Sequence, residues 1–452
     1  MSDPLWGKLK PVNGELIWPP LLRGATASLE SLARFLEDSQ WLPAEEILAR
    51  QHEQLAKLAE YSARFCRAFR ERLKKAGLEP ADLCDAANLS RLPLLSRRDL
   101  QRGDMYCVQP PKEHLPVSET KTSGSTGEPV TVRRTAVTQL FWLANTLREY
   151  FWHERAFDLK FSAIRPTISE YAELPHWGPP AGLLFETGPA QLIPITTSVE
   201  KIAELLTAFE PNVLVIYPNV LTALIAHLRE TDARLPSVKL IRSISETLPP
   251  ALKEEARAFF DARVVDNYSS QEVGVIAVEC PQSGLYHVMS ESLIVEVIGE
   301  GGQACGEGET GRVAITDLHN FATPLVRYDI GDYAQAGGAC SCGRGLPTLK
   351  RILGRERNLI LMPDGSRHWP LVGFARFRDV APVTQYQMIQ TSREEIEVRL
   401  VTESPLSAEQ QGNLGNVICE ALGHPFALKF VYFDERIPAG PRGKFEEFIS
   451  LV

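Results

Sequence analysis

Apolar residues recur at helical spacing between about Pro43 and Gly77, with charged residues between them. Such a pattern is typical of a helix that buries one face and exposes the other. We therefore predict one long amphipathic helix that packs on the main domain and ends at Gly77.

Short β-branched runs alternate with helical stretches farther along the chain. NVLVIYP from Asn212 and VKLIRSI from Val238 are each followed by a helical stretch that begins near a proline, and RVVDNY from Arg263 is a third such run. Strand, helix and strand in series predict a parallel sheet covered by helices. SLIVEVIGE and GRVAITDL flank the glycine-rich segment from Glu300 to Gly311, which indicates a hairpin or a small β-subdomain.

The last hundred or so residues have their own pattern, which begins near Arg355. Two strand-like runs, QYQMIQTS and EEIEVRLVTE, precede a helical stretch from Ser407 to Leu422 and a final run, ALKFVYF. A chain of 452 residues is too long for a single core. We expect an α/β protein with a large N-terminal domain (1–355), containing parallel sheets, helices and a β-subdomain, and a small α+β C-terminal domain (356–452).

Composition narrows the class of protein. A formal net charge of −9 argues against a nucleic-acid binder, since phosphate backbones require a basic face. The N-terminal segment has no secretory pattern and no window has the length of a membrane span, so we expect a cytoplasmic protein. The 8 cysteines are too few to indicate a disulfide framework.

The segment from Thr122 to Pro129 carries the first chemical signal. Two glycines allow the backbone to approach a ligand closely, and hydroxyl groups can donate to phosphate oxygens. The β-branched run that follows predicts a loop between two strands, and no Gly-Lys-Ser/Thr closes it as in a Walker loop. Without other motifs, a flexible Ser/Gly linker is an equal alternative. The candidate phosphate-binding residues are Thr122, Ser123, Gly124, Ser125, Thr126 and Gly127.

Four later segments follow this loop in an order that resembles the adenylate-forming superfamily of acyl-CoA synthetases, peptide-synthetase adenylation domains and luciferases. They are Asn267 to Gly274, Arg327 to Asp332, Arg351 to Arg355, and Pro438 to Lys444. Within the superfamily, the Glu279-Cys280 pair and the Cys340 to Arg344 segment resemble phenylacetate-CoA ligase and its relatives.

The resemblance implies ATP-dependent activation of a carboxylic acid to an acyl-adenylate, followed by acyl transfer. It places Glu272 on Mg²⁺, the Tyr268 ring on adenine, Asp332 on the ribose, Arg355 near the nucleotide, and Lys444 on the carboxylate and α-phosphate. Ser269 and Gln271 belong to the same nucleotide motif. Taken singly, Tyr268 is as compatible with a core aromatic, Asp332 with a turn residue and Lys444 with solvated surface.

Several positions depart from the family pattern. Gln271 stands where the superfamily usually has threonine, Val130 where many members have lysine, and Arg357 at a hinge position commonly Asp or Lys. Pro363 to Ser366 replaces the Gly-Val-Asn stretch of the ligase relatives. CoA is therefore one acceptor, and a carrier protein, an amine or a protein cysteine is an alternative; a nucleotide-binding protein without catalysis is a third. A hinge near Arg357 would let the small domain rotate between half-reactions, as the resemblance implies.

Three cysteines and a histidine form a possible structural zinc site, and some relatives of the ligase group carry zinc at matching positions. The set Cys280, His287, Cys340 and Cys342 has a common Cys3His composition, and Cys305 could replace one ligand. The alternative is a cluster of reduced, partly buried thiols. A catalytic zinc is disfavoured, because four protein ligands leave no open position.

The resemblance also implies where the acid binds. Candidate lining segments are Tyr171 to Phe185, Tyr217 to Asn219, Ser243 to Glu246, and Asn267. His176 and Trp177 favour an aromatic acid, although simple packing explains them equally well. The expected partners are a small carboxylic acid and either CoA or an acyl-carrier protein, with no nucleic acid and no membrane; a homodimer is left open.

Overall fold

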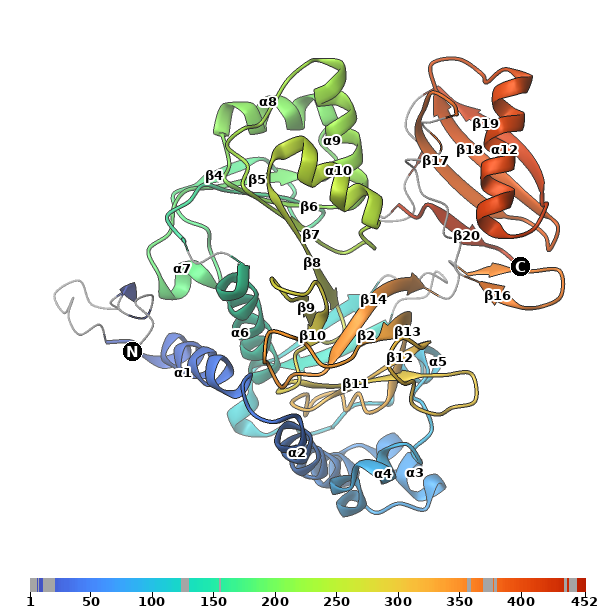
Figure 1. Cartoon of the computed structure of the whole chain (residues 1–452). Coiled ribbons are helices and arrows are strands. Elements are labelled where there is room, and N and C mark those ends of the chain that lie inside the picture. Colours follow the sequence, from blue (N-terminus) through green and yellow to red (C-terminus); the bar gives the residue numbers. More distant parts are fainter. Residues whose placement is uncertain are drawn as a thin grey trace. The chain divides into compact units, whose positions relative to one another are not determined.

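The computed structural model describes residues 6, 8–10, 21–122, 130–153, 156–355, 359–368, 377, 380–434, 437–438 and 445–452. The chain forms two compact units (Figure 1). The first unit comprises residues 1–161, 173–190 and 265–352, and the second comprises residues 162–172, 191–264 and 353–452.

The N-terminal helices of the first unit include the predicted amphipathic segment, but it is divided in two. α2 ends at Phe65 and α3 begins at Arg67, because Cys66 between them is extended (φ −120°, ψ 109°). The Phe65 carbonyl accepts the N–H of Val108, a tertiary contact at the break that periodicity could not reveal. The prediction of a single helix was wrong, whereas its end is confirmed: Gly77 adopts the left-handed conformation (φ 63°) that commonly closes helices. The helices of this unit are α1 (Gly24–Ser39), α2 (Ala44–Phe65), α3 (Arg67–Ala76), η2 (Pro80–Cys84), α4 (Ala86–Leu89), α5 (Arg97–Gln101), η3 (Lys112–His114), α6 (Ala136–His153) and α7 (Ala181–Leu184).

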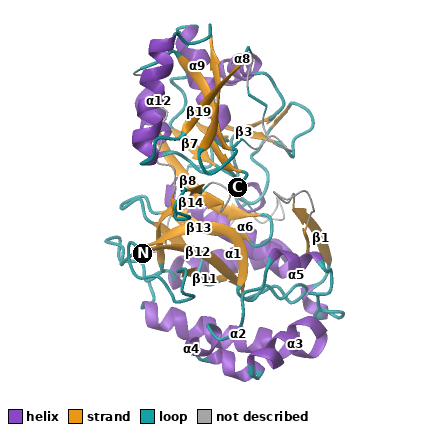
Figure 2. Cartoon of the chain, turned by 90° about the vertical axis from the view of Figure 1, so that its right-hand side faces the viewer, coloured by secondary structure: helices purple, strands orange, loops and turns teal. Residues whose placement is uncertain are grey.

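The first unit also holds a sheet whose strands follow the order β11-β12-β13-β14-β10-β9-β8. Its helices α2, α3 and α4 lie together on one side of β11 and β12 (Figure 2). Apolar side chains from both layers, such as Leu55, Phe69, Val313 and Tyr328, form its main core. A separate antiparallel hairpin, β1 (Val117–Thr122) with β2 (Val130–Thr135), confirms that the hydroxyl-rich segment joins two strands. The sheet strands are β8 (Arg263–Ser270), β9 (Gly274–Glu279), β10 (Tyr286–Val288), β11 (Leu293–Ile298), β12 (Thr310–Asp317), β13 (Tyr328–Ala336) and β14 (Thr348–Arg355).

The second unit contains the predicted parallel strands. β6 (Val213–Ile216) and β7 (Leu240–Ser243) pair in parallel, and α9 (Pro218–Glu230) connects them. All eight residues of these two strands are buried, and α8, α9 and α10 lie beside them (Figure 1). The other elements are β3 (Phe161–Arg165), β5 (Ala190–Pro194), α8 (Val199–Phe209) and α10 (Pro250–Phe260), and β4 (Ala172–Leu174) begins at the last residue of a segment of this unit.

The C-terminal part of the second unit has the predicted β-β-α-β order and a core of its own. The short strands β15, β16 and β20 were not predicted, because two or three residues are too few to give a periodicity; β20 (Phe448–Ser450) pairs in parallel with β17. Within the described ranges, no helix is both long and apolar enough to cross a membrane. The elements are β15 (Ile360–Leu361), β16 (Arg367–His368), β17 (Val383–Gln390), β18 (Glu395–Thr402), α12 (Ala408–Leu422) and β19 (Ala427–Phe433).

Candidate active site

The predicted metal carboxylate lies in the tight turn between β8 and β9. Glu272 is only 4% exposed, and its Oε1 lies 3.9 Å from Nη1 of Arg97 at the start of α5. The turn closes at Gly274 (φ +83°), where an added Cβ would lie 3.1 Å from the Trp142 ring, so only glycine fits without a shift. Mg²⁺ in phosphate enzymes is commonly held by one or two carboxylates together with substrate phosphates. A single buried carboxylate on a rigid turn fits that role.

The residues predicted for adenine and ribose are in direct contact. The Tyr268 hydroxyl donates to Oδ2 of Asp332 at 2.8 Å, across strands β8 and β13. Both side chains are buried, with exposures of 8% and 7%, and Tyr268 belongs to the main core of the unit. Two motifs 64 positions apart in sequence therefore meet, and the core packing of Tyr268 fixes the carboxylate beside it.

The other residues of the nucleotide motif differ in exposure. Ser269, the next-to-last residue of β8, is half-buried, whereas Gln271 is exposed. The Gln271 carbonyl accepts a hydrogen bond from Arg134, a buried residue of β2 that no sequence motif marked. Arg355 ends β14, is half-buried, and is grouped with the second unit.

Several predicted residues lie outside the described part of the chain. They are Ser123, Gly124, Ser125, Thr126, Gly127 and Lys444, together with the Thr122 side chain. Their roles stay predictions.

In the second unit, Glu246 connects a segment predicted to line the acid site with the residue that follows the predicted C-terminal lysine motif. Its carboxylate accepts the N–H of Asn219, in the first turn of α9, at 3.1 Å, and the N–H of Phe445 at 2.9 Å. Phe445 directly follows Lys444. Burial raises the pKa of nearby Tyr217 above its ordinary value of 10.

Trp177 has a packing role in the first unit. Its indole N–H donates to the Leu159 carbonyl at 2.7 Å, and its ring packs against Phe157 and Phe161. His176 beside it is exposed. The packing interpretation of this Trp is therefore confirmed.

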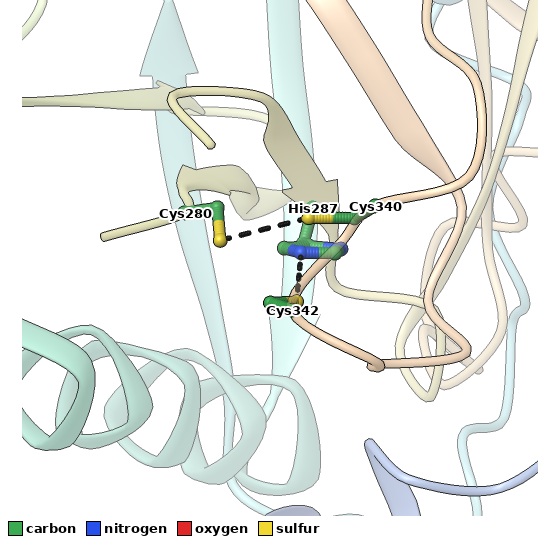
Figure 3. A group of neighbouring side chains, drawn as sticks. All are labelled: Cys280, His287, Cys340 and Cys342. Carbon is green, nitrogen blue, oxygen red and sulfur yellow. Dashed lines mark hydrogen bonds between the residues drawn. The ribbon is translucent and has the colours of Figure 1, made fainter. Parts of the chain in front are cut away.

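The predicted zinc ligands converge. One ligand atom from each of Cys280, His287, Cys340 and Cys342 lies within 4.8 Å of every other, and this is the only such metal-compatible group among the described residues (Figure 3). Cys280 and His287 flank the turn between β9 and β10, and the Cys340 to Cys342 loop reaches them from between β13 and β14. Cys305 is not part of the group, so its proposed exchange with one ligand was wrong.

The donor geometry suits tetrahedral zinc. Sγ of Cys280 and Sγ of Cys340 are 3.7 Å apart, close to the edge of about 3.8 Å that Zn–S bonds of about 2.3 Å imply. His287 Nδ1 donates to the Leu346 carbonyl at 3.2 Å, which leaves Nε2 facing Cys342 Sγ, also at 3.2 Å. Burial lowers the pKa of His287 to about 4, so the ring is neutral at pH 7, the form that binds a metal.

Comparison with known proteins agrees with the resemblance to the CoA ligases. No protein-family model matches the sequence. The chain is 24% identical over 408 residues to a phenylacetate-coenzyme A ligase of Thermus thermophilus, an alignment that spans 86% of this chain and 89% of that protein. A phenylacetate-coenzyme A ligase of Escherichia coli is 23% identical over 72% of this chain and 75% of its own length.

Solved structures share the fold. A 2-hydroxyisobutyryl-CoA ligase bound to an acyl-adenylate superposes with a TM-score of 0.72 at 19% identity, over 90% of both chains. An anthranilate CoA ligase bound to anthranoyl-AMP has a TM-score of 0.56 at 16% identity, over 73% of this chain and 64% of that one. The predicted fold class and the predicted resemblance are both confirmed.

Proposed function

We propose that this chain, which has the fold of the adenylate-forming ligases, activates a carboxylic acid with ATP and transfers the acyl group to CoA. A carboxylate oxygen attacks the α-phosphorus of ATP, the bond to the β-phosphate oxygen breaks, and pyrophosphate leaves. The CoA thiolate then attacks the acyl carbon, and AMP leaves. The observation that carries this proposal is the buried contact between Tyr268 and Asp332, with Glu272 four residues beyond Tyr268.

The chain supplies positioning and charge complementarity for these steps. Asp332 is suited to accept hydrogen bonds from ribose hydroxyls, since a carboxylate only accepts. Tyr268 holds that carboxylate in place, and the adenine would lie near its ring. Lys444 would neutralise the acid and α-phosphate during adenylation, and Arg355 would face the nucleotide at the hinge.

Two metals complete the proposal. Mg²⁺ on Glu272 would neutralise the charge on the ATP phosphates. Zn²⁺ in the Cys3His group would be structural, because all four tetrahedral positions are taken by the chain.

The acid and the acceptor are narrower proposals. We favour an aromatic acid, because the curated relatives are phenylacetate-CoA ligases and one structural neighbour is an anthranilate CoA ligase. The Pro363 to Ser366 stretch keeps a carrier protein or an amine as a second candidate acceptor. We also propose a cytoplasmic location and a boundary between residues 355 and 356, beyond which the C-terminal domain is mobile. A homodimer is a further proposal to be tested.

Carboxylate-dependent ATP–pyrophosphate exchange over a panel of acids tests the first half-reaction. Exchange with an aromatic acid, followed by thioester formation when CoA is added, is the expected result. Exchange without a thioester would favour another acceptor. No exchange with any acid would favour a protein that binds nucleotide without catalysis.

A further inference from the structure

Arg134 is a buried cation at the junction of two motifs. It lies on β2, and its exposure is 6%. Its Nη2 donates to Oγ1 of Thr120 at 2.7 Å and to the Gln271 carbonyl at 2.5 Å. One nitrogen thus connects β1, which leads into the hydroxyl-rich segment, with the turn that carries Glu272.

The same turn is supported at its other end. Trp142 of α6 packs against Gly274, and the Arg134 guanidinium carbon lies 4.6 Å from the centroid of the Trp142 ring. Arg134 and Trp142 therefore contact each other and hold the first and last residues of the turn. Glu272 lies between these two points, so its backbone has little freedom to move.

Charges nearby keep Arg134 in place. Burial lowers its pKa, whereas the carboxylates of Asp317 and Glu272 raise it. Arg134, Glu272 and Asp317 also line a cavity of about 10 Å³, room for about one water molecule. Removal of Arg134 would take a cation away from Glu272, whereas Arg97, at 3.9 Å, would remain beside it.

We propose that Arg134 is a positioning residue, which ties the Gln271–Glu272 turn to strand β1 so that Glu272 can bind magnesium. The inference rests on the proposed function, because it assumes that Glu272 is the metal carboxylate. Arg134 does not touch substrate in this role. It acts through the backbone of Gln271.

Arg133 is a matched control from the same strand. It points to the other face, where Nε donates to Glu119 at 3.0 Å and the guanidinium lies over the Tyr106 ring. Its side chain is 39% exposed. A change at Arg133 removes the same charge from the adjacent position without touching the turn.

The test measures ATP–pyrophosphate exchange against Mg²⁺ concentration in wild type, Arg134→Met, Arg134→Lys and Arg133→Met. We expect Arg134→Met to raise the half-maximal Mg²⁺ concentration by about tenfold or more, the usual effect of losing an outer-shell partner of a metal ligand. The KM for the acid should stay within about twofold. Arg134→Lys should recover most of the loss, since a single ammonium can donate both hydrogen bonds, and Arg133→Met should match wild type.

Equal Mg²⁺ dependence in Arg134→Met and Arg133→Met would overturn the proposal, as would a loss confined to the KM for the acid. Thermal unfolding of each variant separates misfolding from misplacement. If Arg134→Met does not fold, the proposal is tested by comparing Arg134→Lys with Arg134→Gln. Only the lysine variant should keep a Mg²⁺ dependence close to that of wild type.

A second readout separates this inference from the proposed function. If wild type shows no exchange with any acid, the proposed function fails, and calorimetric titration of ATP with Mn²⁺ then tests Arg134 alone. Weaker Mn²⁺-dependent binding in Arg134→Met than in Arg133→Met supports the positioning role. Equal binding in both, or no Mn²⁺-dependent binding in wild type, overturns it.

Discussion

The Cys3His group and the nucleotide residues lie in the same compact unit, yet they are built in opposite ways. The ligand atoms of Cys280, His287, Cys340 and Cys342 all lie within 4.8 Å of one another, an arrangement compatible with four donors to a single metal ion. The residues predicted to bind ribose and Mg²⁺ are instead two separate carboxylates, Asp332 beside Tyr268 and Glu272 in the turn between β8 and β9. The Cys3His group would fill the positions around a metal ion by itself, whereas Glu272 and Asp332 would need the bound substrate to complete their sites.

Burial has a different consequence in each of these two regions. Burial around His287 lowers its pKa and keeps the ring neutral, the form that the proposed structural metal would require. Burial by the surrounding strands fixes the positions of Glu272 and Asp332, and cationic side chains of the chain, Arg97 at 3.9 Å and Arg134, already lie near Glu272. Changes in the first region should therefore affect stability, and changes in the second should affect catalysis.

The largest catalytic loss is expected from Lys444→Ala. Exchange should fall by about 10²–10³-fold, because a positioned cation no longer neutralises the developing charge. Turnover of a supplied acyl-adenylate should be largely retained. Lys429→Ala, a solvent-facing lysine of β19 near Glu397, is the control and should match wild type. Equal loss in both half-reactions would contradict the role of Lys444.

Glu272→Gln should reduce exchange by about 10²-fold, since the amide has lost the negative charge that holds Mg²⁺. Exchange is measured at saturating ATP over a range of Mg²⁺ concentrations. Gln271→Thr, which introduces the residue usual in the superfamily, should keep activity near wild type. Similar losses of exchange activity in both variants would show that the activity depends on the conformation of the turn and not on the Glu272 carboxylate.

Asp332→Asn should raise the KM for ATP by about tenfold, the loss expected when charge-assisted hydrogen bonds to the ribose become neutral. The exchange rate at saturating ATP should change less. Tyr268→Phe removes only the hydroxyl that orients Asp332, and a smaller increase is expected from it. A KM unchanged in Asp332→Asn would remove the ribose role.

Cys280→Ser should remove bound zinc and lower the unfolding temperature, while activity per folded molecule at 25 °C stays within about twofold. Metal analysis of protein purified without chelator, together with thermal unfolding, tests this. Cys305→Ser is the matched control and should change neither. Zinc-free wild-type protein, or a complete loss of activity in folded Cys280→Ser, would contradict a structural zinc.

The smallest catalytic effect is expected from Asp317→Asn. This substitution should instead change how the free energy of unfolding depends on pH. Burial raises the pKa of Asp317 to about 7, above its ordinary value of 3.8. Its contribution to stability is then fully present below pH 3.8 and is lost as pH rises through 7. The free energy of unfolding of wild type, from urea denaturation, should therefore fall relative to Asp317→Asn between pH 4 and pH 8. A constant difference would show that Asp317 keeps an ordinary pKa.

Much of the fold could be predicted from the sequence where one periodicity dominates. The buried runs of β6 and β7, the hairpin of β11 and β12, and the β-β-α-β order near the C-terminus all follow local patterns. The break at Cys66 could not be predicted, because the contact of Val108 with Phe65 decides it. Strand β20 was missed for a related reason: its pairing with β17 defines it, and its three residues do not.

The same division holds for the candidate site. Motif order was enough to nominate Glu272 and Asp332 as candidate site residues without any coordinates, and the cysteine and histidine content nominated the Cys3His set. The folded chain was needed to show that Tyr268 contacts Asp332, that Cys305 lies outside the Cys3His group, and that Arg134 donates to the Gln271 carbonyl. Motifs record local chemistry, whereas contacts between residues far apart in sequence depend on how strands and helices pack, and a linear pattern does not specify that packing.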